Sequence, residues 1–271
     1  MIRFALVGAG SVGKSFLAGL PRLREQLGPV AAASTRLASR IANTLGAGTP
    51  VNSLDDLDAC GTILLCPGGR TVEAVAGKLR DAKVCWAGKI LLLCDSKLSS
   101  DAIPDFRTRG AACGSIDRLG DLTGRFVVEG DGAALRVAKY LAEELGGKPI
   151  ELRLEKALSY RAALTFSSGL FMPLIEGCVE CLQDAGIPAA MARQIAESLF
   201  QRSLRDYMHA GRKGWFGTAT WAIPEMVEKE IEGLRASKPL LAAYYRTSAM
   251  LTRELCDRYP ELARRLKNQN H

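Results

Sequence analysis

Residues 4–17, FALVGAGSVGKSFL, contain the clearest candidate for chemistry in the sequence, a glycine-rich loop after a short apolar run. Glycines spaced G-x-G-x-x-G let the backbone turn tightly after a strand, and the free N–H groups of the next helix then face an anion. The pattern predicts a loop that holds the pyrophosphate of a dinucleotide. The predicted cofactor-binding residues of this loop are Gly8, Gly10, Ser11, Val12 and Gly13.

The same loop also fits G-x-x-x-x-G-K-S, a pattern typical of loops that hold a nucleoside triphosphate. In that pattern Lys14 would contact the β- and γ-phosphates, and the hydroxyl of Ser15 would bind magnesium. No N-K-x-D segment for guanine recognition occurs in the sequence. A nucleotide hydrolase with a phosphate loop is therefore an alternative function.

The end of the second apolar run favours the dinucleotide. In dinucleotide-binding folds a second strand ends about 20 residues past the third glycine, beside the adenosine ribose. Here the run VAAASTR places Ser34 21 residues beyond Gly13. An acidic residue at this point favours NAD, whereas hydroxyls and a guanidinium suit a 2′-phosphate. Ser34, Thr35 and Arg36 thus predict NADP, the alternative being that Arg36 and Arg40 form a solvated helix face.

A further predicted cofactor-binding loop is CPGG, residues 66–69, which follows the third apolar run. Ligands of such sheets lie across the carboxyl ends of the strands. Cys66, Pro67 and Gly68 are therefore predicted to flank the nicotinamide ribose. Proline and glycine also form ordinary turns, so turn chemistry alone is the alternative explanation.

Short apolar runs alternate with helical stretches over residues 1–155, which predicts an α/β domain, a doubly wound parallel sheet with helices on both faces. The predicted strands are 3–8, 29–34, 62–66, 89–94, 111–116, 125–130 and 149–154. The predicted helices between them are 11–27, 36–46, 70–80 and 132–145.

Residues 156–271 contain no further strand-like run, and their pattern predicts an all-α C-terminal domain. Residues 156–186 form one long apolar helical pattern, which Pro173 should kink. Further helices are predicted at 189–210, 218–235 and 239–257.

Composition narrows the possible partners. The 271 residues are 48% apolar, and the net charge of +7 is not concentrated in a basic tail. This mild excess suits anionic small molecules and is weak support for nucleic-acid binding. No run approaches the ~20 apolar residues of a membrane span, and no leader pattern precedes the first strand. We expect a cytoplasmic protein that binds a small-molecule substrate and neither nucleic acid nor membranes.

The eight cysteines predict no metal site. The one C-x-x-C pair, Cys178 and Cys181, lies in a helical pattern without a second pair at zinc spacing. Most of the other cysteines lie in or beside apolar runs, where thiols act as small hydrophobes. A reducing compartment is consistent with all of them.

An ordered set of motifs runs through nearly the whole chain: the glycine loop, STR, GSI, FVVEGD, KALSYRAALTFSSG and KPLLAAYYRTSAMLTREL. The set resembles a family of bacterial proteins that join a Rossmann domain to a C-terminal helical domain of unknown function. Such proteins are often labelled NADP oxidoreductases of the deazaflavin-dependent type, and they are distantly similar to pyrroline-5-carboxylate reductase and 6-phosphogluconate dehydrogenase. The resemblance implies NADP binding, a cleft between the domains and a homodimer formed through the helical domain.

The chain departs from this family where its relatives carry histidine and asparagine. Relatives tend to have S-L-H-P-L where this chain has SIDRL, so that Asp117 stands at the histidine. Relatives tend to have Y-H-A-A where this chain has Tyr160 and Arg161, and Gly169 stands where an asparagine is usual. Neither histidine of the chain falls at these positions, so imidazole proton transfer there is impossible.

Hydride transfer requires alignment and a proton source. Lys156 and Tyr160 fall on one face of the predicted long helix, and either could donate the proton. Arg161 could bind a substrate carboxylate or phosphate, and Asp117 could position either cation. The plainer alternative is that these residues are a helix-start charge, a core aromatic side chain and a loop carboxylate.

The sequence predicts an NADP(H)-dependent oxidoreductase that acts on a small, anionic imine or carbonyl substrate. The missing histidines and asparagine leave a second hypothesis open, a non-catalytic NADP-binding sensor or scaffold. The phosphate-loop hydrolase is the third.

Overall fold

A computed structural model describes residues 3–8, 24–67, 72–94, 99–119, 124–211 and 224–258. The chain divides into two compact units, Met1–Thr165 (the sheet unit) and Phe166–His271 (the helical unit). The division falls within helix α6 (Ala157–Ser167), whereas the sequence pattern put the limit of the first domain at residue 155.

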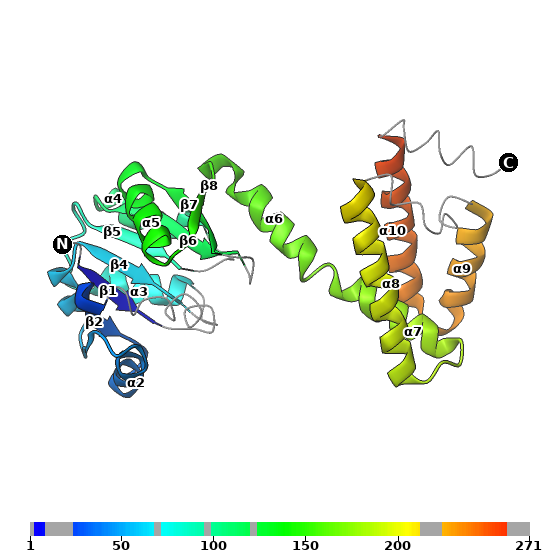
Figure 1. Cartoon of the computed structure of the whole chain (residues 1–271), viewed down its shortest axis with the longest axis horizontal. Helices are drawn as coiled ribbons and strands as arrows, with labels where there is room; N and C mark the ends of the chain where they lie inside the picture. Colours follow the sequence, from blue (N-terminus) through cyan, green and yellow to red (C-terminus); the bar gives the residue numbers. More distant parts are fainter. Residues whose placement is uncertain are drawn as a thin grey trace. The chain divides into compact units, whose positions relative to one another are not determined.

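The sheet unit is built on eight strands in the order β3-β2-β1-β4-β5-β6-β7-β8 (Figure 1). The strands are β1 (Phe4–Val7), β2 (Leu27–Ala31), β3 (Thr49–Pro50), β4 (Thr62–Leu65), β5 (Ile90–Leu93), β6 (Ala112–Arg118), β7 (Arg125–Gly130) and β8 (Lys148–Glu151). Every pair of neighbours is parallel except β6 and β7, which are antiparallel. The chain winds outward from β1 on one side and from β4 on the other, so the predicted doubly wound α/β fold is confirmed.

The central strands are continuously apolar because both faces of the sheet are covered. In β1, Phe4 and Leu6 join the core on one face, and Ala5 and Val7 join the core on the other. Helices from two parts of the chain cover each face: α2 (Thr35–Leu45) and α5 (Gly132–Glu144) the first, and α3 (Val72–Asp81) and α4 (Pro104–Thr108) the second. Short 3-10 turns occur at η2 (Leu54–Ala59), η3 (Ser100–Ala102) and η4 (Leu154–Lys156).

The structure corrects the sequence prediction at the two edges of β2 and at β3. Leu27, expected at the end of a helix, begins β2. The strand predicted to reach Ser34 ends at Ala31, because Ser34 is the N-cap of α2. Strand β3 was missed, since it has two residues, both exposed, and therefore no apolar pattern.

The helical unit contains α7 (Met172–Asp184), α8 (Ala189–Ala210), α9 (Pro224–Ser237) and α10 (Pro239–Asp257), and the last three lie close to their predicted ranges. The single long helix predicted over 156–186 is instead broken between α6 and α7, at residues 168–171. Pro173 lies in the first turn of α7, where its missing N–H and its ring do not allow the preceding turn to continue.

The stretch Leu154–Asp184 is long and apolar enough to cross a membrane by length and composition, with a mean hydropathy of 1.4 over its best window. Of that window, 11% is buried. The sequence expectation that no run approaches this length is corrected here. The break at residues 168–171 divides the stretch into two shorter helices, α6 and α7.

Gly130 ends β7 at a point where no other residue fits. Its φ is 133°, and a Cβ atom here would lie 2.4 Å from the carbonyl oxygen of Cys113 on β6. The close approach lets Asp131 return a backbone N–H to the Cys113 carbonyl over 2.9 Å.

We expect Gly130→Ala to lower the free energy of unfolding by about 3 kcal/mol, because it adds backbone strain and an overlap with β6. Gly77→Ala is the matched control. Gly77 lies inside α3, and the nearest atom to an added Cβ is 3.8 Å away, so that alanine should stabilise the sheet unit by about 0.5–1 kcal/mol. Urea denaturation followed by circular dichroism measures both, and equal small effects would contradict the expectation.

Candidate functional site

The carboxyl ends of β1 and β4 form the switch point of the sheet, because the chain leaves these neighbouring strands toward opposite edges. Gly8 follows β1 with a φ of 72°, and a Cβ atom on it would lie 2.6 Å from the carbonyl oxygen of Cys66. The Gly8 N–H donates to the Ala31 carbonyl over 2.8 Å, and the Cys66 N–H donates to the Val7 carbonyl over 2.9 Å. Glycine at position 8 is therefore required by the close approach of two chain segments, where ligands of this fold bind.

The N-terminus of α2 carries the three residues predicted to recognise NADP. Ser34 caps the helix, since its hydroxyl accepts a hydrogen bond from the Leu37 N–H over 3.3 Å. The Thr35 hydroxyl donates to the side-chain oxygen of Asn52, a residue after β3 that sequence reasoning missed. Arg36 is exposed and makes no ion pair with any described residue. Its guanidinium can therefore bind an anion at this helix N-terminus.

The remaining predicted cofactor residues are placed less favourably or are not described. Cys66 and Pro67 are buried at the end of β4, so they offer backbone rather than side-chain groups to a ligand. Outside the described residues lie Gly10, Ser11, Val12, Gly13 and Gly68, together with Lys14 and Ser15 of the triphosphate pattern.

Two predicted catalytic residues, Asp117 and Tyr160, meet in the structure. The Tyr160 hydroxyl, on α6, donates a hydrogen bond of 3.0 Å to the Asp117 carboxylate, near the carboxyl end of β6. Asp117 is 7% exposed, and Tyr160 is half-buried. Burial and the adjacent negative charge raise the pKa of Tyr160 above its ordinary value. The phenol therefore stays protonated at neutral pH and can serve as a proton donor.

Lys156 and Arg161 lie on either side of Tyr160 in the sequence, and neither has a described contact with Tyr160 or Asp117. Lys156 ends η4 and is exposed, and its amine makes no hydrogen bond or ion pair with any described residue. Arg161 is half-buried, and its Nε atom is buried without a hydrogen-bond partner among the described residues. A buried donor left unpaired is costly, so a bound anion would satisfy this atom.

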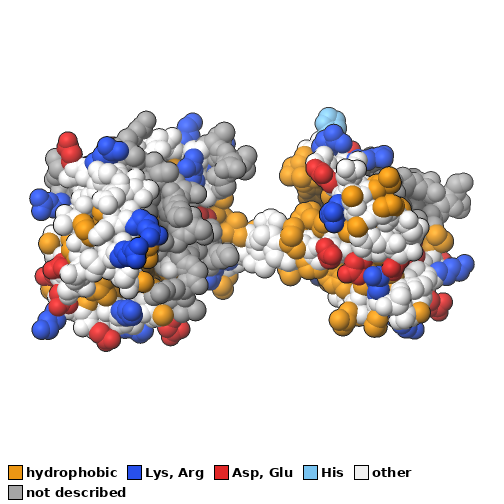
Figure 2. All heavy atoms as spheres, turned by 90° about the horizontal axis from the view of Figure 1, so that it is seen from below, with side chains coloured by type: hydrophobic (Ala, Val, Ile, Leu, Met, Phe, Trp, Pro, Cys, Tyr) orange, Lys and Arg blue, Asp and Glu red, His pale blue; other side chains and the backbone are white. Residues whose placement is uncertain are grey.

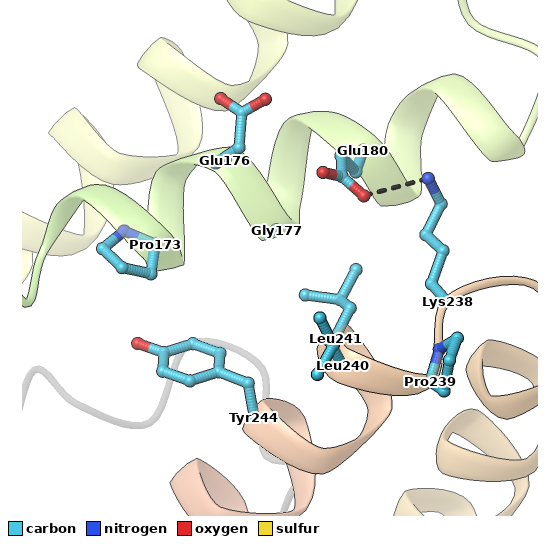
Figure 3. A pocket seen from close by; sticks show the side chains of 9 residues that line it. All are labelled: Pro173, Glu176, Gly177, Glu180, Lys238, Pro239, Leu240, Leu241 and Tyr244. Atoms are coloured by element: carbon cyan, nitrogen blue, oxygen red, sulfur yellow. Dashed lines mark hydrogen bonds and ion pairs between the residues drawn. The ribbon is translucent and has the colours of Figure 1, made fainter.

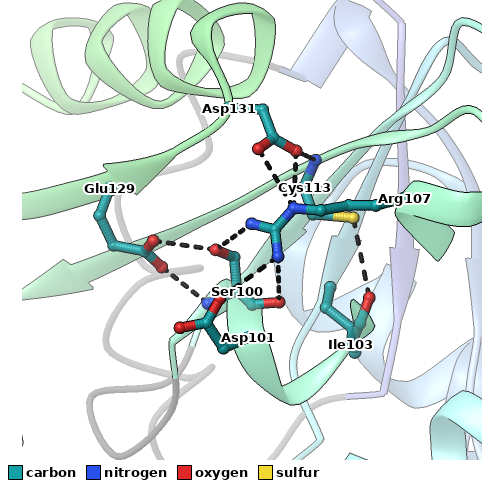
Figure 4. A network of polar contacts seen from close by, with 7 residues as sticks. All are labelled: Ser100, Asp101, Ile103, Arg107, Cys113, Glu129 and Asp131. Carbon is teal, nitrogen blue, oxygen red and sulfur yellow. Dashed lines mark hydrogen bonds and ion pairs between the residues drawn. The ribbon is translucent and has the colours of Figure 1, made fainter. Parts of the chain in front are cut away.

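A second buried polar group, which sequence reasoning missed, lies between β7 and η3 (Figure 4). Glu129 is 2% exposed, and its carboxylate accepts hydrogen bonds from the Ser100 N–H over 2.7 Å and from the Ser100 hydroxyl over 2.9 Å. Arg107 donates to the Ser100 hydroxyl over 2.6 Å and to Asp131 over 2.9 Å. The available signal was the EGD of FVVEGD, in which a carboxylate interrupts a buried strand.

Several of the described cysteines are poor nucleophiles. Burial raises the pKa of the Cys113 thiol to about 11, and it also raises the pKa of Cys178 and Cys181. These thiols stay protonated at neutral pH, in which form they are unreactive. Within the described part of the chain, no group of three or more His, Cys, Asp or Glu side chains could hold a metal ion.

The helical unit has an open hollow of about 510 Å³ between α7 and α10 (Figure 3). Its lining residues are Pro173, Glu176, Gly177, Glu180, Lys238, Pro239, Leu240, Leu241 and Tyr244. The amine of Lys238 lies 2.9 Å from Glu180 and 3.5 Å from Asp184. Most of the exposed lining is apolar, and Leu240 is 87% exposed. The hollow is therefore a mainly apolar depression of the surface.

Comparison with protein-family models gives a match over part of the chain. Residues 125–252 match the family model described as a domain of unknown function, DUF2520. No curated protein matches the sequence at a significant level.

Solved structures resemble the chain over nearly its full length. Protein TM1727 from Thermotoga maritima is 19% identical, with 94% of this chain and 98% of that chain covered and a TM-score of 0.64. The imine reductase from Myxococcus stipitatus in complex with NADP+ is 16% identical, with 95% of each chain covered and a TM-score of 0.66. A pyrroline-5-carboxylate reductase from Coxiella burnetii is 13% identical, with 94% and 98% covered and a TM-score of 0.52. These likenesses confirm the fold class, a Rossmann-type sheet followed by a helical region.

We expect Asp117→Asn to lower the pKa of Tyr160 while leaving it above the ordinary 10.0, because the charge is removed and the burial remains. Ultraviolet titration of tyrosinate, as the difference between each protein and its Tyr160→Phe version, measures the shift. The folded chain holds this proton more tightly than the unfolded chain, so stability falls as the pH rises above 10.0, and less steeply in Asp117→Asn. An unchanged titration would show that Asp117 does not act on Tyr160 in solution.

Proposed function

We propose that the protein is an NADP(H)-dependent oxidoreductase that reduces a C=N or C=O bond in a small anionic substrate. The observation that carries the proposal is that three features lie at the carboxyl ends of the strands. Gly8 lies against Cys66 at the switch point, and the exposed Arg36 stands at the N-terminus of α2. The Asp117–Tyr160 pair lies near the carboxyl end of β6.

The described residues fit a bound dinucleotide. A Cβ atom on Gly8 would overlap the carbonyl oxygen of Cys66, so glycine lets the chain ends after β1 and β4 lie close together, at the point of the sheet where a pyrophosphate is expected. Arg36 has no ion pair with any described residue and suits a 2′-phosphate. The names of the similar structures point the same way, since they include an imine reductase in complex with NADP+ and a pyrroline-5-carboxylate reductase. The deazaflavin-dependent subtype stays a prediction.

The pair of Tyr160 and Asp117 supplies the proton chemistry of the proposed reaction. When bound, NADPH supplies a hydride to the carbon of the substrate double bond. The substrate nitrogen or oxygen must then gain a proton, which the Tyr160 hydroxyl donates as it turns from Asp117. Burial and the Asp117 carboxylate disfavour the tyrosinate, so return of a proton from solvent to Tyr160 is favourable. Arg161, with its unpaired Nε, would hold the substrate anion.

We expect NADPH to bind and Arg36→Ala to weaken that binding by about 1.5–3 kcal/mol, the range typical of hydrogen bonds to charged groups. Binding of NADH should hardly change, because NADH lacks the 2′-phosphate. Isothermal titration calorimetry measures both. Arg136→Ala, an exposed arginine on α5, is the control and should leave both affinities unchanged.

Two results would count against the cofactor assignment. Absence of NADPH binding by the unaltered protein would remove the proposed function. Equal losses for NADPH and NADH in Arg36→Ala would place Arg36 outside the 2′-phosphate site.

We further propose that the protein is a homodimer assembled through its helical unit. Apolar side chains are exposed along several of these helices, and Figure 2 shows hydrophobic side chains over the visible face of this unit. Leu240 is 87% exposed and Met208 74% exposed, and the hollow of Figure 3 adds an apolar depression. Monomers rarely expose large apolar surfaces to water, so a second copy would cover these side chains.

We expect a particle of twice the 29.1 kDa chain mass in size-exclusion chromatography with light scattering, without detergent. The double variant Leu240→Glu/Met250→Glu should shift the particle toward the monomer, because both side chains are exposed on α10 and charges there oppose apolar packing. Ile150→Glu, an exposed apolar position on β8, is the control and should leave the mass unchanged. A monomeric protein, or one soluble only in detergent, would contradict the proposal.

A further inference from the structure

We propose that Glu129 is a positioning residue for the nicotinamide half of the cofactor, acting through Ser100. The inference rests on the proposed function, since it assumes that a dinucleotide lies across the carboxyl ends of the strands. Its starting point is a buried carboxylate to which the Asp117–Tyr160 proton chemistry assigns no role.

The strand pairing places Glu129 level with the end of β5, two strands away from it in the sheet. Glu129 on β7 pairs with Ser115 on β6, and Ser115 pairs in turn with Leu93, the last residue of β5. Residues paired directly across neighbouring strands share a face, and so do residues two apart on one strand. Asp117 therefore lies on the same face of the sheet as Ser115 and Glu129, and it is one step nearer the carboxyl edge.

The Glu129 carboxylate binds Ser100, which follows β5 along the chain. Both of its described hydrogen bonds come from Ser100, one from the backbone N–H and one from the hydroxyl (Figure 4). Ser100 is fully buried, and it begins η3. A carboxylate satisfied by two donors of one residue fixes both the backbone and the side chain of that residue.

Ser100 is held from its other side by a guanidinium. Arg107 donates to the Ser100 hydroxyl over 2.6 Å, so that this hydroxyl links the positive charge to Glu129. Arg107 is itself fixed by Asp131, whose carboxylate also accepts the Cys113 N–H over 2.7 Å. The group therefore ties the chain after β5 to both β6 and β7.

The cost of this arrangement argues for a role beyond stability. A buried carboxylate is expensive, and Glu129 makes no direct ion pair with any described residue. Apolar residues at this place would stabilise the sheet at lower cost. In sheets of this topology the ligand lies outside the carboxyl ends of the strands, with its two halves on opposite sides of the switch point. The adenosine half would lie toward β2, and the nicotinamide half toward β5 and β6, the side of the switch point on which Ser100 and Glu129 lie.

The test compares the whole cofactor with its adenosine half. Calorimetric titrations of the full chain use NADPH and adenosine 2′,5′-bisphosphate as probes. Glu129→Gln keeps the shape but turns one acceptor into a donor that faces Ser100. We expect affinity for NADPH to fall at least tenfold and affinity for adenosine 2′,5′-bisphosphate to stay within twofold. Ser100→Ala keeps the backbone N–H, so it should show the same split with a smaller loss.

The controls separate positioning from general damage. Val128→Ala removes buried volume on the opposite face of the same strand, so it should lower the melting temperature without splitting the two affinities. Parallel losses for both probes in Glu129→Gln and Ser100→Ala, or no loss for either, would overturn the inference while leaving the proposed function in place. Failure of the unaltered protein to bind either probe would overturn the proposed function, and the inference with it.

Discussion

The approach of Gly8 to the carbonyl of Cys66 is the constraint on which the candidate site depends. Strands β1 and β4 are neighbours, yet the chain leaves them toward opposite edges of the sheet, which makes their carboxyl ends the place where ligands of such sheets bind. The 2.6 Å that would separate a Cβ atom at position 8 from the Cys66 oxygen shows how little space the backbone leaves there. The switch point therefore presents backbone groups, and the polar side chains of the candidate site lie on either side of it, near α2 and near the ends of β6 and β7.

The two sides of the switch point differ in how their polar groups are held. At the α2 end, Arg36 is exposed and free of ion pairs with the described residues, so its charge is available at little desolvation cost. At the β6 and β7 end, Asp117 and Glu129 are both buried, and hydrogen bonds from Tyr160 and Ser100 fix them. An exposed guanidinium such as that of Arg36 suits recognition of a phosphate, whereas carboxylates held by hydrogen bonds suit the alignment that hydride and proton transfer require.

The sequence predicted most of the fold, because apolar runs buried on both faces leave a strong signal. It could not predict β3, whose two exposed residues carry no apolar signal. The sequence predicted a kink at Pro173, and the structure has a full break between α6 and α7 instead. The site was predicted in part. Asp117 and Tyr160 were found through their place in motifs, and their hydrogen bond joins residues 43 apart in sequence. Glu129 was missed, since a carboxylate in a buried strand has a meaning only once its partner Ser100 is known.

The boundary between the two units shows which of them contains Tyr160. Tyr160 precedes the division at Thr165, and its hydrogen bond to Asp117 ties it to β6. The break at residues 168–171 separates α6 from α7. The sheet unit therefore contains both the residues predicted to bind the cofactor and the Asp117–Tyr160 pair.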